Sequence, residues 1–177
     1  MGDDRFTIPD DDTWGGGGGG VDLHARFSGL AHATPEQSVA DTPVVSMTTS
    51  EVRYSFDDGF AKMEYEIRIH RPKDITLVHF HCATAGNNGP VVVVFLKDMD
   101  GADVESLEGT LTNDDIEMFE EENGDPSMCE GVKVINLASL YQAMKNGSIY
   151  LNVHDKEFPA GVNRGQIFTS PPPVKSM

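Results

Sequence analysis

Two histidines separated by one residue, His79 and His81, are the side chains of this sequence best placed to do chemistry. They end the segment 74–81, whose composition is that of a β-strand. Residues two apart on a strand leave the same face with Cα atoms about 7 Å apart, so both imidazoles can reach one ion. The pair therefore permits a transition-metal site, which is the alternative to a module that only binds proteins. Strand histidines that are hydrogen-bonded in a polar cleft would give the same pattern, and that alternative stays open.

A third imidazole would complete the set of three nitrogens from which many copper and zinc sites are built. A histidine on another strand could supply it, such as His154 in the strand predicted over 149–154. Imidazole ligands suit copper, zinc, iron and nickel. The other histidines, His24, His32 and His70, stand alone near expected strand ends, where surface or packing roles explain them.

The motifs of nucleophilic and phosphate-transferring enzymes are absent from the sequence. It contains no Gly-x-Ser-x-Gly and no His-Glu-x-x-His, and the run of six glycines over 15–20 is not followed by the lysine of a phosphate-binding loop. Hydrolase and kinase functions are therefore unsupported. We expect a non-enzymatic binding module.

The charge of the chain limits its partners. It carries 29 acidic against 13 basic side chains, for a formal net charge of −16. Such a surface repels phosphates, which excludes nucleic acid and anionic lipid as main partners. The longest apolar run, 91–96, is far too short to span about 30 Å of hydrocarbon, and the start Met-Gly-Asp-Asp lacks the features of a signal peptide. A protein partner is the expectation, and the oligomeric state stays unknown.

One domain is expected between two tails. Residues 1–22 are rich in aspartate and glycine and should form a flexible tail, whereas 170–177 form a proline-rich tail. The domain covers 23–169. Within it, Cys82 and Cys129 can form one disulfide or remain two buried thiols, and their spacing does not decide between these.

Alternating apolar and polar residues predict a β-rich domain. The segments 44–56 and 60–70 flank Asp57-Asp58-Gly59 and form a hairpin; 74–81 and 90–96 form a second, with the continuous apolar run typical of a central strand. Further strands are predicted over 104–111, 149–154 and 164–168, and short helices over 114–122 and 137–145. This pattern indicates an antiparallel Greek-key β-sandwich, superoxide dismutase-like or immunoglobulin-like, with two capping helices.

Several of these segments occur in a familiar order. A Tyr-Glu-Ile-Arg-Ile strand precedes a His-x-His strand and Ala-Gly-Asn-Asn-Gly-Pro-Val-Val-Val; Ser-Ile-Tyr-Leu-Asn-Val-His and Phe-Pro-Ala-Gly-Val-Asn-Arg-Gly-Gln-Ile follow. From about His24 to Phe168 the chain resembles the CHRD domain, the module repeated in chordin. The resemblance implies a β-sandwich and protein–protein interaction, within a larger assembly as an accessory subunit. It also implies an extracellular or organelle-lumen location, because CHRD domains are mostly found in exported proteins.

A more distant resemblance concerns the histidines. The His-x-His strand and the late Val-His-x-Lys segment are similar to the copper-binding strands of Cu,Zn superoxide dismutase, and in that resemblance His79, His81 and His154 correspond to copper ligands. No further histidine between Cys82 and Val104 can bridge to a zinc ion. If the chain is an enzyme, the resemblance therefore implies a copper-only, dismutase-like oxidoreductase.

Overall fold

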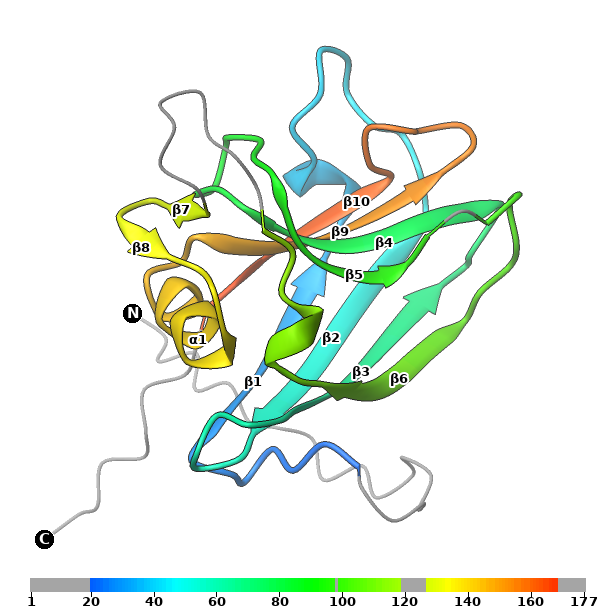
Figure 1. The fold of residues 1–177 in the computed structure, drawn as a ribbon. Coiled ribbons are helices and arrows are strands. Elements are labelled where there is room, and N and C mark those ends of the chain that lie inside the picture. Colours follow the sequence, from blue (N-terminus) through cyan, green and yellow to red (C-terminus); the bar gives the residue numbers. More distant parts are fainter. Residues whose placement is uncertain (1–19, 98, 119–126, 169–177) are drawn as a thin grey trace, which may run out of the picture.

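Two four-stranded antiparallel sheets pack face to face in the computed structural model, which describes residues 20–97, 99–118 and 127–168 (Figure 1). The first sheet has the strand order β1, β2, β3, β6, with bounds Phe27–Ala33, Thr49–Phe56, Met63–His70 and Ser106–Leu111. The second has the order β10, β9, β4, β5, with bounds Asn163–Ile167, Ile149–Asp155, Ile75–Cys82 and Val91–Leu96. The predicted β-sandwich is confirmed. Most of the first predicted tail and all of the second lie outside the described residues.

The predicted hairpin around Asp57-Asp58-Gly59 is present. β2 and β3 pair in register from Thr49 opposite His70 to Phe56 opposite Met63, and the backbone N–H of Lys62 donates to Asp57 Oδ1 (2.6 Å). Alternate residues of β3 enter the core, as the period of two predicts for a strand with one buried face. Pairing starts at Thr49, so the segment 44–48, which was predicted as strand, is unpaired.

The apolar run of β5 is not in a central strand, which corrects the prediction. β5 lies at the end of its sheet and pairs only with β4 among the named strands. Its other edge meets a short stretch of chain: Ile116 bridges to Val93, and the N–H of Glu117 donates to the carbonyl of Val92 (2.8 Å). This cover explains how an apolar strand can occupy a sheet edge.

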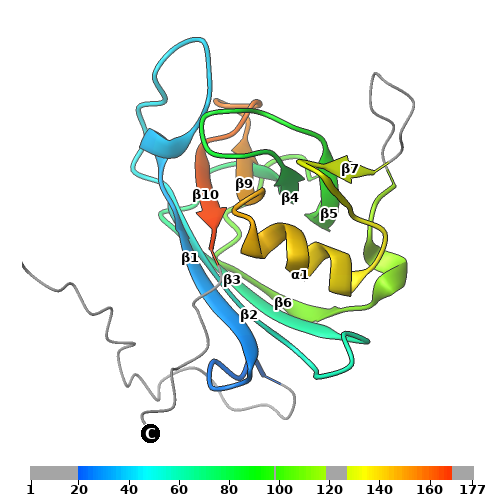
Figure 2. The same cartoon turned by 90° about the vertical axis from the view of Figure 1, so that its left-hand side faces the viewer.

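One of the two predicted helices is confirmed. α1 spans Leu137–Lys145, begins with a capping box at Asn136, and buries one apolar stripe in the core. Figure 2 shows it lying between the ends of the two sheets. The helix predicted over 114–122 is wrong where it can be checked: Asn113–Asp115 form a single 3-10 turn, after which Ile116 is extended and buried against Val93. Residues 119–122 lie outside the described part.

The sequence patterns missed four short elements: β1, the 3-10 turn Pro35–Gln37, and the small hairpin of β7 (Met128–Cys129) and β8 (Val132–Lys133). β1 matters for the architecture because its end joins the two sheets. Thr34 and Arg164 exchange both backbone hydrogen bonds, at 2.9 and 3.1 Å. This contact closes one side of the sandwich.

The open question about the cysteines is answered by the structure, in which Cys82 and Cys129 form a disulfide with Cα atoms 5.6 Å apart. The bond links the end of β4 to β7. Among the described residues, no helix has the length and apolar character needed to cross a membrane.

Candidate metal centre

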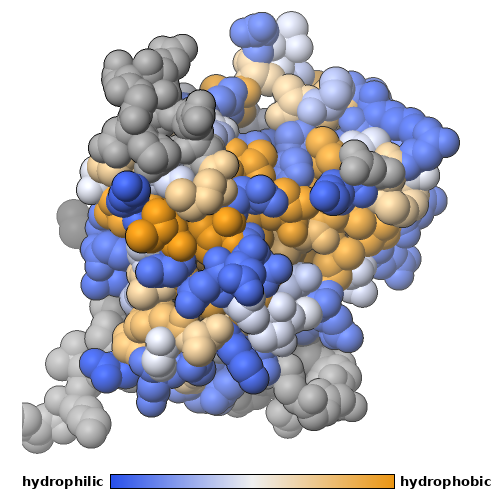
Figure 3. Space-filling model, viewed as in Figure 1, coloured by the Kyte–Doolittle hydropathy of each residue, from blue (hydrophilic) through white to orange (hydrophobic). Residues whose placement is uncertain are grey.

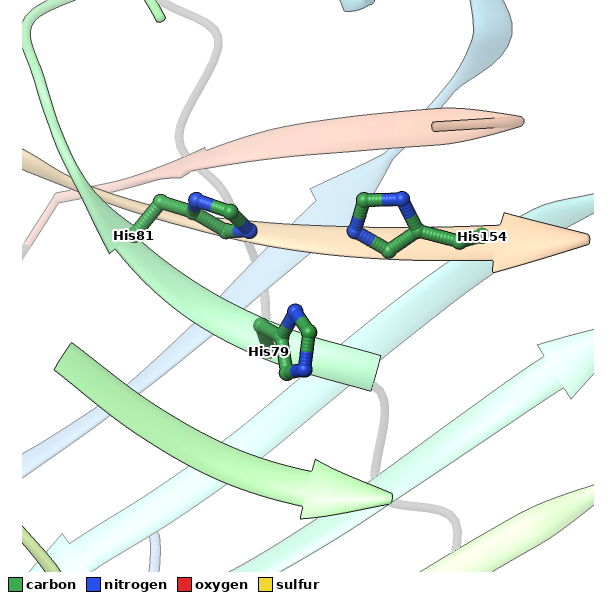
Figure 4. Close-up of side chains that lie close together, drawn as sticks. All are labelled: His79, His81 and His154. Atoms are coloured by element: carbon green, nitrogen blue, oxygen red, sulfur yellow. The ribbon is translucent and has the colours of Figure 1, made fainter. Parts of the chain in front are cut away.

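The alternation of side chains on β4 and β9 places all three candidate histidines on one face. Val78 and Phe80 of β4, like Leu151 and Val153 of β9, point into the core. The residues between them must point the other way, because successive side chains of a strand leave opposite faces. His79, His81 and His154 therefore share the outer face of the second sheet. The cluster predicted from the sequence does come together in space (Figure 4).

The three rings form a nearly regular triangle. Their centres are 5.4 Å apart for His79 and His81, 5.4 Å for His79 and His154, and 5.9 Å for His81 and His154. An ion about 2.0–2.1 Å from each nitrogen would lie roughly 3.2 Å from each ring centre, and three such rings would have centres roughly 5.5 Å apart. The observed triangle has this size.

One ligand nitrogen from each ring lies within 4.8 Å of the others. Around a bound ion these nitrogens would be roughly 3.5 Å apart. Since the ring centres already have the right spacing, turning the rings is enough to close the difference. Figure 4 shows one nitrogen of each ring facing the space between them.

Hydrogen bonds to the backbone select the free nitrogen in two of the rings. His81 Nδ1 lies 2.9 Å from the carbonyl oxygen of Gly89, and His154 Nδ1 lies 2.8 Å from that of Pro159. A carbonyl can only accept, so each Nδ1 carries the proton and donates, which leaves the lone pair on Nε2. Histidines that bind metals almost always donate their second N–H in this way.

The nitrogens left over are buried and have no partner. Within the described residues, His79 Nδ1, His81 Nε2 and His154 Nε2 make no hydrogen bond, and His79 and His154 are only 8% and 6% exposed. Leaving one buried acceptor unpaired costs about 1–3 kcal/mol. Three of them at a single point suit a cation, which can accept all three lone pairs at once.

Burial also keeps the rings uncharged. It lowers the pKa of His79 to about 4, with repulsion from His154 and His81 adding to the effect. It lowers the pKa of His81 to about 4 as well, against the opposing hydrogen bond to Gly89. The pKa of His154 is lowered by burial too, although the bond to Pro159 and the nearby Asp155 carboxylate oppose this. At neutral pH a metal therefore has no proton to displace.

Two loops hold the donating histidines, and each contains a glycine at a crowded point. A Cβ at Gly89 would lie 1.6 Å from the carbonyl oxygen of Cys82, so the chain can pass there only as glycine. Gly161 has φ = +128°, and a Cβ there would meet Asn152 Oδ1 at 2.3 Å. These glycines let the 83–90 and 156–162 loops return close to the sheet and present their carbonyls to the imidazoles.

Sequence reasoning missed the polar side chains that surround His81. Tyr150 stacks on the His81 ring with centres 5.1 Å apart and planes at 10°, and the guanidinium of Arg164 lies 3.6 Å from the centre of the Tyr150 ring. Arg164 is only 2% exposed. A buried arginine in a strand is not visible in an alternation pattern; the strand register that places Tyr150 opposite His81 is the signal that could have found the stack.

The metal-free protein should lose stability as the pH falls from about 6.5 towards 4. In this range the unfolded chain protonates His79 and His81 at their ordinary pKa of 6.5, whereas the folded protein keeps them neutral down to about 4. The unfolded state then binds more protons, so the free energy of unfolding decreases with falling pH. Urea unfolding at pH 7, 6, 5 and 4 with a chelator present measures it.

The double variant His79→Gln/His81→Gln is the control for this slope. Its carboxylates titrate as in the parent chain, so the difference between the two pH profiles isolates the imidazoles. We expect the variant to lose distinctly less stability over the same range. Parallel profiles would contradict neutral, buried histidines.

Fold and site together define a class: a β-sandwich domain with a three-histidine cluster on the outer face of one sheet. The model of one family, the CHRD domain, matches residues 30–167, which covers both sheets and the whole cluster. The chain belongs to the CHRD domain family. No match was found among curated proteins or among solved structures.

Proposed function

We propose that this CHRD domain is a non-enzymatic module that binds a transition metal, copper in the first place, through His79, His81 and His154. The observation that carries the proposal is the convergence of three buried, unpartnered imidazole nitrogens within 4.8 Å. Backbone carbonyls already hold two of the rings in the tautomer that a metal needs. The geometry thus reverses the order of preference from the sequence, which put a protein partner first.

The donor set favours copper over the other divalent metals. It consists of imidazoles alone, and among the described residues no carboxylate or thiolate joins the group. Nitrogen sites of this kind follow the order in which copper binds more tightly than nickel, cobalt, iron or zinc. Zinc, which also accepts three histidines and a fourth ligand, is the second choice.

Copper stoichiometry in a protein produced without a histidine tag tests the proposal. The parent chain should take up one copper per molecule and keep it through gel filtration. The triple variant His79→Gln/His81→Gln/His154→Gln should retain none while its circular dichroism stays that of the parent. A matched triple variant of His24, His32 and His70 should bind as the parent does. Equal copper content in parent and triple variant would overturn the proposal.

A protein partner is the second candidate function, and exposed apolar side chains favour it. Val45 and Met47 are 84% and 68% exposed in the segment that precedes β2. Figure 3 shows further apolar surface in a band across the face that carries β5. Exposed apolar patches are typical of protein interfaces. With a net charge of −16, the partner would be a protein with a basic rim around an apolar centre.

The two candidates are separable by substitution. Val45→Ser/Met47→Ser should weaken binding of the native partner and leave copper content unchanged. The triple histidine variant should do the reverse. Loss of the partner in the histidine variant alone would refute a separate apolar interface.

A further inference from the structure

A series of direct contacts connects the buried guanidinium of Arg164 to His81. The Arg164 guanidinium donates from Nη1 to the carbonyl of Asn87 (2.7 Å) and from Nη2 to that of Thr84 (3.1 Å), and its Cζ lies over the Tyr150 ring, 3.6 Å from the ring centre. Tyr150 in turn stacks on His81. Arg164 thereby fixes both the loop 84–88 and the ring that covers one face of the imidazole.

At Gly89 the same loop contacts both Tyr150 and His81. The backbone N–H of Gly89 donates to the Tyr150 hydroxyl (3.2 Å), and its carbonyl accepts from His81 Nδ1 (2.9 Å). His81 is thus held on its face by Tyr150 and at its edge by Gly89. Both depend on Arg164. Within the part of the chain that the structure describes, no ring stacks on His154 in this way, and His154 is held through Pro159 instead.

The burial of the Arg164 charge costs free energy. Arg164 is buried, and within the described residues its hydrogen bonds go to neutral oxygens only: the carbonyls of Asn87 and Thr84 and the side-chain oxygens of Asn88 and Gln166. Removing a charge from water without a carboxylate to pair it is unfavourable. Stacking on Tyr150 recovers only about 2 kcal/mol. An apolar side chain could fill this position at a lower cost, but it could not hold these four oxygens in place.

We propose that Arg164 and Tyr150 are positioning residues that fix the orientation and tautomer of His81 for metal binding. The inference rests on the proposed function, because metal binding is what requires His81 to keep one orientation and one tautomer. It assigns the two residues no contact with the metal. Their effect acts through His81 alone, and this separates a positioning role from a general contribution to the fold.

The tautomer of His81 in the metal-free protein is the first readout. Nitrogen-15 spectra of the parent chain should show His81 and His154 both protonated at Nδ1. In Arg164→Gln the loop loses its anchors, so His81 should become a mixture of tautomers while His154 stays unchanged. Tyr150→Phe keeps the ring but not the hydroxyl, and should produce a smaller shift of the same kind.

Copper affinity and electron paramagnetic resonance give the second readout. Groups that hold a metal ligand in its orientation are worth about 10–100-fold in metal affinity. Arg164→Gln should therefore weaken copper binding by that factor, keep one copper per molecule, and alter the copper hyperfine splitting. Arg164→Lys should not restore the parent spectrum, since an ammonium offers no planar fork. Arg26→Gln, which removes an exposed arginine 4.9 Å from the Phe27 ring, is the matched control and should change nothing.

The outcomes separate the two proposals. A parent chain that binds no copper overturns the proposed function. A parent chain that binds copper, with Arg164→Gln and Tyr150→Phe equal to it in affinity, spectrum and tautomer, overturns only the positioning role. If Arg164→Gln fails to fold, Tyr150→Phe decides: an unchanged His81 tautomer and spectrum in that variant reject the inference.

Discussion

Replacing His154 by glutamine is expected to weaken copper binding by between about a hundredfold and about a thousandfold. Zinc sites with four ligands bind with about 10–16 kcal/mol, or about 2.5–4 kcal/mol for each ligand, and each 1.4 kcal/mol is a factor of about ten. His154 supplies one of three donors and the only one from β9. Competition against a coloured copper chelator at pH 7 measures the change.

His70→Gln is the matched control for this experiment. His70 is an exposed histidine on β3, in the other sheet, and lies outside the cluster. It should bind copper as the parent chain does. A loss of less than about threefold in His154→Gln, or an equal loss in His70→Gln, would mean that copper binds somewhere other than the cluster.

Removing the disulfide with Cys82→Ser/Cys129→Ser is expected to lower the free energy of unfolding by about 4 kcal/mol. The bond closes a loop with a sequence separation of 47, and for a loop of that length the chain-entropy model gives about this value. The cost should appear mainly through the unfolded state, because serine is similar in size to cysteine and leaves the packing of the folded state nearly unchanged. Urea unfolding of variant and parent under non-reducing conditions measures it.

A reductant provides the control for the disulfide. It should destabilise the parent chain to the level of the double serine variant and leave the variant itself unaffected. A loss below about 1 kcal/mol in the variant would show that the bond does not constrain the unfolded chain as the model requires.

Local patterns predicted the elements whose stability is local. The β2–β3 hairpin has an alternating strand beside an aspartate–glycine turn, and α1 has its cap, its apolar stripe and a glycine after its end in consecutive residues. The helix predicted after Thr112 failed for the opposite reason. Its cap is real, but Ile116 is extended, buried and bridged to Val93 of β5, so pairing with the sheet takes the place of a further helical turn.

Part of the candidate site could be predicted from the sequence, because the proximity of His79 and His81 is also a local property of the chain. The spacing of His79 and His81 fixes a shared strand face, so their proximity follows from β-geometry alone. His154 joins the cluster because β9 pairs with β4, which lies far away in the sequence. Only a family resemblance indicated that His154 belongs to the site. The stack of Arg164 and Tyr150 on His81 was not predicted, because it depends on the register of β4 and β9 and on the path of the 84–89 loop.

The outer position of the cluster has an evolutionary consequence. In β4 the residues that hold the sandwich together and the histidines alternate, so each set can change without disturbing the other. A lineage can discard the histidines through three separate substitutions and inherit an intact domain, or recruit them onto a scaffold that already folds. Members of the CHRD family should accordingly divide into those that keep the triad and those that do not, with the same architecture in both.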